Sequence, residues 1–444
     1  MLVVLHGWSD QAGSFRPLVR RLFDAGLRDD VAEIHLGDWL SLDDEVTFAD
    51  LSAAMMRAWQ ARGLPVSPRS VDVLVHSTGA LVVRDWQLQH FTPETTPVHR
   101  FLMLAPVNYG SPLAHMGRSL FGRAVKGWRG SRLFETGTHL LRGLELASHY
   151  TAGLASRDWF GDQQWFGPGR VLATVLTGNT GYTGIQAVAN KPGSDGTVRV
   201  ASANLAAASL SVDFSTEPTR PTYRFSADNI NRAAFGVIDG EDHSSICAKG
   251  GGPRSERSLP AMLRALNLDD DELDDWIAEL AEENKAITER RHSGRSSHHH
   301  GYQDTIFRVK DQYGQPVTDY AIEFFVNGDS GRRARRMTRD FLQSVIANVH
   351  VFRGDSSRRS FLIDCRALER LLDRDDDQLF VSITATPDIH RRQVGFRTYT
   401  DADIGDLALT RSQVSSLFQP HRTLFVDLTL LREQRKQVFV MRDA

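Results

Sequence analysis

Short runs of apolar residues alternate with longer stretches of helical periodicity over the first two thirds of the chain. Each run is continuously apolar, as is usual for parallel strands that are covered on both faces. Six such runs are candidate strands, at residues 2–5, 31–36, 71–75, 101–104, 171–176 and 233–238. Residues 14–27 and 48–63, between the first three runs, repeat apolar side chains at helical spacing. We therefore predict an α/β domain whose parallel sheet carries helices on both faces.

Residues 110–169 interrupt this alternation after the fourth candidate strand. The segment has helical spacing and is rich in arginine, lysine and aromatic side chains. An insertion of this length at the end of a strand is typical of an added substructure. We expect it to form a helical cap on the α/β domain.

The chain changes character after residue 268. An acidic run at 269–271 precedes a helical pattern that ends at Arg290 and Arg291, so the charges suit both ends of a helix. Residues 292–301 are polar and are typical of a linker. From residue 302 onward, short strands of alternating pattern are separated by turns, and a basic run at 331–339 is predicted as a loop. We predict three parts: an α/β domain at 1–268, a helix and linker at 269–301, and a sandwich-like β-rich domain at 302–444.

Composition excludes several classes of protein. The formal net charge of −3 gives no basic surface for a nucleic acid. Cys247 and Cys365 are the two cysteines, and we expect no disulfide framework. The sequence has no apolar run that spans a bilayer, no signal-peptide pattern, and no calcium-loop spacing in its acidic run. We expect no bound metal, and a protein that is cytoplasmic or exported without a cleavable signal peptide.

The stretch VLVHSTGALVVRDW, residues 73–86, places Ser77 at a corner between a buried strand and a helix. Such a turn forces the serine into strained backbone angles and holds its hydroxyl above the sheet edge. Gly79 lets the strand and the helix pass closely, whereas Val75 stands where a glycine is usual. The alternative is a serine that only caps the following helix. We predict that Ser77 is a nucleophile and that the Thr78 amide donates to an oxyanion.

A His-Gly-Trp sequence follows the first candidate strand. Gly7 allows a substrate to approach the backbone closely, so we expect the Trp8 N–H to be the second oxyanion donor. The alternative is a simple turn at the end of the strand. We expect His6 to be a packed, hydrogen-bonded residue.

Asp195 and His243 complete a candidate triad with the serine. Asp195 lies in a Gly-Ser-Asp-Gly turn after the fifth candidate strand, and His243 follows the sixth. A base on this last loop can reach back over the serine, and an acid can orient that base and stabilise its cation. We interpret His76 and His90 as structural. The rival acids beside the histidine are Asp239, Glu241 and Asp242.

Taken together, these stretches resemble the α/β-hydrolase superfamily over about residues 1–265. The motifs that carry the resemblance are HGW, VHSTGALVVRDW, SDGTVRVASAN and DHSSI, in the order serine, aspartate, histidine that this fold uses. The stretch LMLAPVNYGSPLA, residues 102–114, is similar to one that leads into a lid in the lipase-like branch. This branch includes the lecithin–cholesterol acyltransferases and the GPI-deacylases.

The resemblance implies a carboxylic ester hydrolase that works through an acyl-enzyme and needs no cofactor. A lipase or phospholipase is the leading hypothesis, with a lipid or other ester as substrate and peripheral contact with a membrane. One alternative is a short-chain esterase or thioesterase with the same triad. Another is a catalytically silent binding or effector protein that works through its β-rich domain.

The predicted cap has two interpretations under this hypothesis. Its aromatic residues either form the core of the cap or contact a long acyl chain; they are Phe121, Trp128, Phe134, Trp159, Phe160, Trp165 and Phe166. Its basic residues either rest on anionic lipid or face solvent; they are Arg118, Arg123, Lys126, Arg129 and Arg132.

Overall fold

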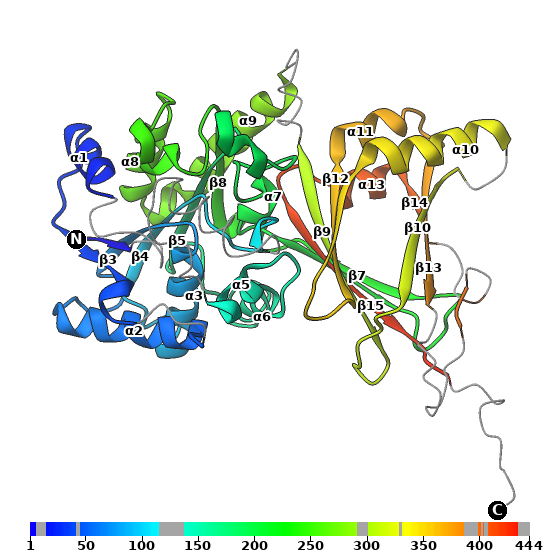
Figure 1. Cartoon of the computed structure of the whole chain (residues 1–444), viewed down its shortest axis with the longest axis horizontal. Coiled ribbons are helices and arrows are strands. Elements are labelled where there is room, and N and C mark those ends of the chain that lie inside the picture. Colours follow the sequence, from blue (N-terminus) through cyan, green and yellow to red (C-terminus); the bar gives the residue numbers. More distant parts are fainter. Residues whose placement is uncertain are drawn as a thin grey trace, which may run out of the picture. The chain divides into compact units, whose positions relative to one another are not determined.

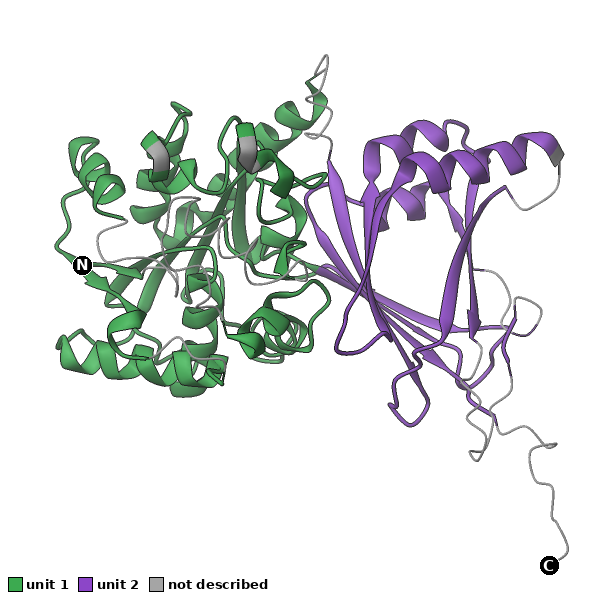
Figure 2. Ribbon diagram, viewed as in Figure 1, with its two compact units in different colours: residues 1–207, 228–300 green, residues 208–227, 301–444 purple. Residues whose placement is uncertain are grey.

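The computed structural model of the chain (Figure 1) describes residues 1–5, 15–40, 45–114, 137–290, 301–327, 331–385, 398–400, 403 and 407–433. The chain divides into two compact units (Figure 2). Unit 1 contains residues 1–207 and 228–300, and unit 2 contains residues 208–227 and 301–444. Each unit has its own hydrophobic core. Within the described ranges, no helix has both the length and the apolar composition to cross a bilayer.

Unit 1 is built on a six-stranded sheet in the order β2-β1-β3-β4-β5-β8. Each pair of neighbours in this order runs parallel. The six strands lie at the predicted apolar runs: β1 (Leu2–Leu5), β2 (Val31–Ile34), β3 (Val71–His76), β4 (Val98–Leu104), β5 (Leu172–Gly178) and β8 (Ala233–Ile238). The predicted parallel α/β sheet is therefore confirmed. Its strands all end at the same edge, so the loops that follow them can meet there.

Helices cover both faces of this sheet, as Figure 1 shows. One face carries α1 (Arg16–Asp24), α8 (Ser258–Leu266) and α9 (Leu273–Glu289). The other face carries α2 (Phe48–Ala61), α3 (Gly79–His90), α5 (Thr138–Leu144) and α6 (His149–Asp158). The short helix α7 (Val200–Ala203) follows the acid-bearing turn described below.

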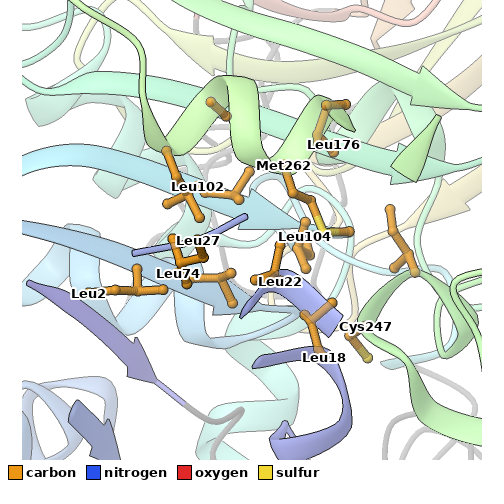
Figure 3. Close-up of a cluster of buried hydrophobic side chains, with 14 of the residues drawn as sticks. Leu2, Leu18, Leu22, Leu27, Leu74, Leu102, Leu104, Leu176, Cys247 and Met262 are labelled. Atoms are coloured by element: carbon orange, nitrogen blue, oxygen red, sulfur yellow. The ribbon is translucent and has the colours of Figure 1, made fainter. Parts of the chain in front are cut away.

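The core beneath α1 and α8 explains the helical spacing seen in the sequence. Leu18 and Leu22 of α1 and Met262 of α8 gather over Leu102 and Leu104 of β4 (Figure 3). The two β4 residues are alternate positions of one strand, so they point to the same face. All five side chains are buried, and this burial is the main force that fixes α1 and α8 on the sheet.

The described part of the predicted cap consists of α5, α6 and the loop up to residue 169. Trp159, Trp165 and Phe166 are almost fully buried there, so they belong to the core of this segment. Residues 115–136 lie outside the described residues. The predictions for the five basic residues, and for Phe121, Trp128 and Phe134, fall within that range.

Unit 2 contains two sheets and is β-rich, as predicted. The larger has the order β11-β12-β9-β15-β6-β7, and the smaller has the order β10-β13-β14. Phe324 of the smaller sheet meets Phe361 of the larger edge to face at 6.2 Å, so the two sheets share one core. The strands are β6 (Ala208–Asp213), β7 (Thr222–Ser226), β9 (Tyr302–Asp311), β10 (Tyr320–Val326), β11 (Ile346–Val351), β12 (Arg358–Asp364), β13 (Gln378–Ala385), β14 (Leu407–Thr410) and β15 (Thr423–Leu430).

The unit boundaries differ from the predicted ones at the β6–β7 hairpin. This hairpin lies inside the segment predicted as a catalytic domain, yet β6 pairs in parallel with β15 at the far end of the chain. Ala208 and Val212 of β6 are buried in the core of unit 2. Helix α9, predicted as a separate element before a linker, packs Leu273, Trp276 and Leu280 into the core of unit 1. Residues 291–300 lie outside the described residues.

The basic run at 331–339 is helical, which corrects the predicted loop. It forms most of α10 (Gly331–Asp340) and continues into a π-helical turn at Phe341–Val345. Ala334, Met337 and Phe341 are buried at spacings of three and four, so one face of the helix packs while the arginines occupy the others. Two further helices of unit 2 are α11 (Cys365–Leu371) and α13 (Arg411–Leu417).

Candidate active site

Ser77 stands at a sharp turn between β3 and α3. Its backbone has φ of +55°, a left-handed conformation that costs energy for a residue with a side chain. A Cβ atom on Gly79 would lie 3.3 Å from the Cβ atom of Val75 and 3.6 Å from the Leu5 carbonyl oxygen. The turn is therefore tight in spite of Val75, because Gly79 provides the necessary room. This strained strand–turn–helix corner is the geometry of a nucleophile elbow.

A chain of hydrogen bonds joins the three predicted catalytic side chains. The Ser77 Oγ atom lies 3.1 Å from His243 Nε2, and His243 Nδ1 lies 2.9 Å from Asp195 Oδ2. All three residues are fully buried. Since Ser77 Oγ bonds to His243, the alternative in which the serine only caps α3 has no support, and no side-chain cap is found at the start of that helix.

Two loops bring the acid and the base to the serine. Asp195 follows β5, and its Oδ1 atom accepts the backbone N–H groups of Thr197 at 2.9 Å and Val198 at 2.7 Å. His243 follows β8, and its backbone N–H donates to the Asp195 carbonyl oxygen at 2.9 Å. The two loops are thus tied to each other through the main chain, which fixes the distance between acid and base.

The rival acids have other partners. Asp239 accepts from the Asn179 side chain and pairs with Arg290. Asp242 accepts the N–H groups of Ser244 and Ser245. Glu241 accepts the N–H groups of Arg254 and Ser255 and the hydroxyl groups of Ser245 and Ser258. These carboxylates therefore shape the loop that carries His243, while Asp195 holds its ring.

The predicted oxyanion donors are only partly covered by the structure. Thr78 is the N-cap residue of α3 and directly follows the serine, so its N–H lies at the positive end of that helix. Gly7 and Trp8 lie outside the described residues, and the second donor remains a prediction. Among the described residues, no group of three or more histidine, cysteine, aspartate or glutamate side chains could hold a metal ion.

Neither the protein-family models nor the curated proteins give any match to this chain. Solved structures do match this chain. The phospholipase PlaB from Legionella pneumophila aligns with a TM-score of 0.78 at 21% identity, covering 100% of this chain and 96% of that one. The same phospholipase in complex with thio-NAD gives a TM-score of 0.77 at 21% identity with the same coverage. The mature form of the Bacillus licheniformis lipase BlEst2 covers 60% of this chain at 18% identity with a TM-score of 0.37.

The fold is that of an α/β-hydrolase. The parallel sheet, the elbow after its third strand, and the order Ser77, Asp195, His243 along the chain agree with this fold. The coverage by PlaB extends through unit 2, so the whole two-unit architecture is shared. The narrower resemblance to acyltransferases and GPI-deacylases remains a prediction.

Two residues around this α/β-hydrolase site have contacts that were not predicted from the sequence. The Tyr182 hydroxyl lies 2.8 Å from Thr197 Oγ1, and a Cβ atom on Gly196 would lie 2.7 Å from the tyrosine ring. Burial raises the pKa of Tyr182, so its hydroxyl stays protonated and can donate. His76, interpreted from the sequence as structural, contacts the backbone carbonyl oxygen of His243. The histidine directly before the serine is the one sequence signal for this contact.

Proposed function

We propose that this protein is a serine hydrolase that cleaves carboxylic esters, and that its substrate is a lipid. The observation that carries the proposal is the hydrogen-bonded series Ser77, His243, Asp195 at a strained elbow. A serine hydroxyl is a weak nucleophile until a base accepts its proton. The 3.1 Å contact between Ser77 Oγ and His243 Nε2 supplies that base.

Acylation begins when Ser77 Oγ attacks the ester carbonyl carbon and His243 Nε2 takes the hydroxyl proton. Asp195 holds the imidazole in the tautomer whose Nδ1 carries a hydrogen, and it stabilises the cation that forms. The carbonyl oxygen becomes an oxyanion, and each N–H that points at it contributes about 3 kcal/mol. Thr78 and Trp8 are the proposed donors. His243 then protonates the leaving alcohol, and the acyl-enzyme remains.

Deacylation repeats the same steps with water in place of the serine. His243 takes a proton from water, the resulting hydroxide attacks the acyl carbon, and the proton returns to Ser77 Oγ as the acid leaves. The cycle is balanced, because the ester and one water give one alcohol and one carboxylic acid.

A lipid substrate is supported by the coverage over both units of a protein that is named a phospholipase. A hydrolase of small soluble esters has no evident need for a second unit of this size. Peripheral contact with a membrane follows from a lipid substrate. We assign that contact to no particular residues, because the basic segment at 118–132 lies outside the described part of the chain.

Labelling with a fluorophosphonate probe tests the enzyme proposal directly. Wild type should be labelled at Ser77, and Ser77→Ala should be neither labelled nor active, with a loss in kcat of about a million-fold. An unlabelled wild type, or equal labelling of Ser77→Ala, would refute the enzyme proposal in favour of a catalytically silent binding protein.

The dependence of activity on the length of the acyl chain tests the lipid proposal. We expect activity on p-nitrophenyl esters to persist or rise from short to long acyl chains, and we expect lipidomics of treated membrane extract to differ between wild type and Ser77→Ala. A sharp fall beyond short chains would favour the short-chain esterase or thioesterase alternative. Identical lipid profiles would remove the lipid substrate.

A further inference from the structure

His76 contacts the proposed base in two ways, although the mechanism above gives it no step. Its side chain is fully buried at the end of β3, directly before the nucleophile. The His76 Nε2 atom lies 2.8 Å from the backbone carbonyl oxygen of His243. The two imidazole rings lie 4.6 Å apart at an angle of 50°. One side chain therefore meets both the main chain and the ring of the base.

The direction of this hydrogen bond follows from the protonation state of His76. Burial lowers its pKa well below the ordinary value, and the charges of His243 and Lys249 act in the same direction. The imidazole is therefore neutral and carries a single N–H. A carbonyl oxygen can only accept, so Nε2 holds the hydrogen and donates it. Nδ1 has no hydrogen-bond partner among the described residues, so the Nε2–H bond is the polar contact that fixes this ring.

Besides its bond to the Ser77 hydroxyl, His243 has three polar anchors, and two of them come from the acid. Its backbone N–H donates to the Asp195 carbonyl oxygen, and its Nδ1 faces the Asp195 carboxylate. The third anchor, on the backbone carbonyl, comes from His76. Because His76 and Ser77 are neighbours in the chain, this hydrogen bond ties the base directly to the end of the strand that carries the nucleophile.

We propose that His76 is a positioning residue that sets the distance between His243 and Ser77 through the His243 backbone carbonyl. This inference rests on the proposed function. Other bonds hold the base loop to the acid and, through Glu241, to residues 254–258, but none of the described ones besides that of His76 ties the His243 main chain to β3. Without this anchor, the base can move away from the serine. A displacement of about 1 Å at reacting atoms can cost about 100-fold in rate, so the effect falls on kcat while substrate binding is spared.

Two amide substitutions that differ in reach test this proposal. His76→Gln places an amide N–H near the position of Nε2, whereas His76→Asn carries the same amide one methylene shorter. His76→Phe retains a planar ring without a donor. His90→Gln, at the far end of α3, is the control for replacing a histidine away from this site. Activity is measured on p-nitrophenyl butyrate, and active sites are counted by stoichiometric fluorophosphonate labelling.

We expect His76→Asn and His76→Phe to lower kcat per labelled site by roughly 10- to 100-fold, with KM within about two-fold of wild type. His76→Gln should recover most of this loss, and His90→Gln should match wild type. Counting per labelled site removes the contribution of unfolded protein, because only an assembled site reacts with the probe.

Three results would overturn the inference. Equal kcat per labelled site in all the variants would show that the anchor is dispensable. A loss of total activity in the His76 variants that is matched by an equal loss of labelled sites would show a role in folding only. Equal losses in His76→Gln and His76→Asn would show that the donor position is irrelevant. An unlabelled, inactive wild type would instead refute the proposed function, and this inference with it.

Discussion

At the scale of single residues, the site depends on how the acid is held. Asp195 uses one carboxylate oxygen for the N–H groups of Thr197 and Val198 and the other for His243. Because two rigid backbone donors fix the first oxygen, the second is aimed at the imidazole before any substrate binds. Such preorganisation is what allows a buried carboxylate to control the tautomer of a histidine.

Replacing Asp195 by asparagine should keep this geometry and remove its effect. The amide can face His243 with an N–H, which favours the wrong tautomer, so we expect kcat to fall by about 10⁴-fold. Asp239→Asn is the matched control, because Asp239 bonds to Asn179 and Arg290 and has no contact with the triad in the described structure. Steady-state kinetics on one p-nitrophenyl ester checks both. A comparable loss of kcat in Asp239→Asn would indicate that Asp239 is the catalytic acid.

Stability should depend on pH through a histidine on β4. Burial, together with Arg100 and Arg69, lowers the pKa of His99 from 6.5 to about 4. The unfolded chain therefore binds this proton at a higher pH than the folded chain does, and the free energy of unfolding decreases as the pH falls from about 6.5 to about 4. Melting temperatures across this range should fall less steeply for His99→Gln. An equally steep fall of melting temperature with pH in wild type and His99→Gln would contradict the assignment of this effect to His99.

At the scale of elements, a buried ion pair joins α3 to α6, which lies in the segment predicted as a cap. Arg84 on α3 donates to both carboxylate oxygens of Asp158 on α6, at 2.7 and 2.9 Å. The same guanidinium donates to the Asn108 side chain at 3.0 Å, so it also holds the loop after β4. Both charged side chains are almost completely buried. Neither can be removed without leaving the other unpaired in a dry environment.

Asp158→Ala should therefore lower the free energy of unfolding by about 3–5 kcal/mol. Glu217→Ala is the matched control. It breaks the Arg220–Glu217 pair, whose side chains are 83% and 57% exposed, and it should change stability by less than about 1 kcal/mol. Urea unfolding measures both variants. Similar small effects would mean that solvent reaches the Arg84 pair.

The turn that carries the acid depends on a glycine. Gly196 has φ of +98°, and an added Cβ atom would lie 2.7 Å from the Tyr182 ring. We expect Gly196→Ala to displace the turn and lower kcat by more than about 10-fold. Gly153→Ala is the control, because a Cβ atom there meets nothing within 4 Å in the interior of α6. A fully active Gly196→Ala would show that the turn tolerates displacement.

At the scale of the whole molecule, the β6–β7 hairpin belongs to unit 2 although it interrupts the sequence of unit 1. Ser209 of β6 pairs with Ser226 of β7, so the hairpin leaves and re-enters unit 1 at neighbouring points. All three residues of the proposed triad lie within unit 1. The hairpin can therefore be replaced by a short linker without interrupting the chain around the site.

A fragment of residues 1–300 should aggregate, because its hairpin lacks β15 and exposes Val212 and Phe214, which unit 2 buries. The same fragment with residues 208–227 replaced by a short Gly-Ser linker should be soluble and should hydrolyse p-nitrophenyl butyrate. Light scattering and kinetics check the pair. A soluble, folded but inactive linker fragment would show that unit 2 contributes to the site.

Much of unit 1 could be predicted from sequence because its signals are local. A strand covered on both faces is a continuous apolar run, and Ser77 is flagged by its immediate neighbours. The loops that follow the strands of a parallel sheet converge at one edge, so Asp195 and His243 could be matched to Ser77 from chain order alone.

The missed features depend on partners far along the chain. The alternation of β6 is visible, but nothing near Ala208 indicates that its partner is β15. The arginine-rich run of α10 has a small apolar face of Ala334 and Met337, and Phe341 continues this face to Phe324 on β10. His76 is buried, and a buried histidine in a sequence gives no sign of which carbonyl it reaches.

The separation between β6 and β15 also has a consequence for synthesis on the ribosome. About 210 residues must be translated after Asp213 before Thr423 emerges, which takes roughly 10–40 s at ordinary elongation rates. During that delay the nascent hairpin has a vacant neighbour position. Transient binding by a molecular chaperone, or a slow final pairing of β6 with β15, is the expected consequence of this arrangement.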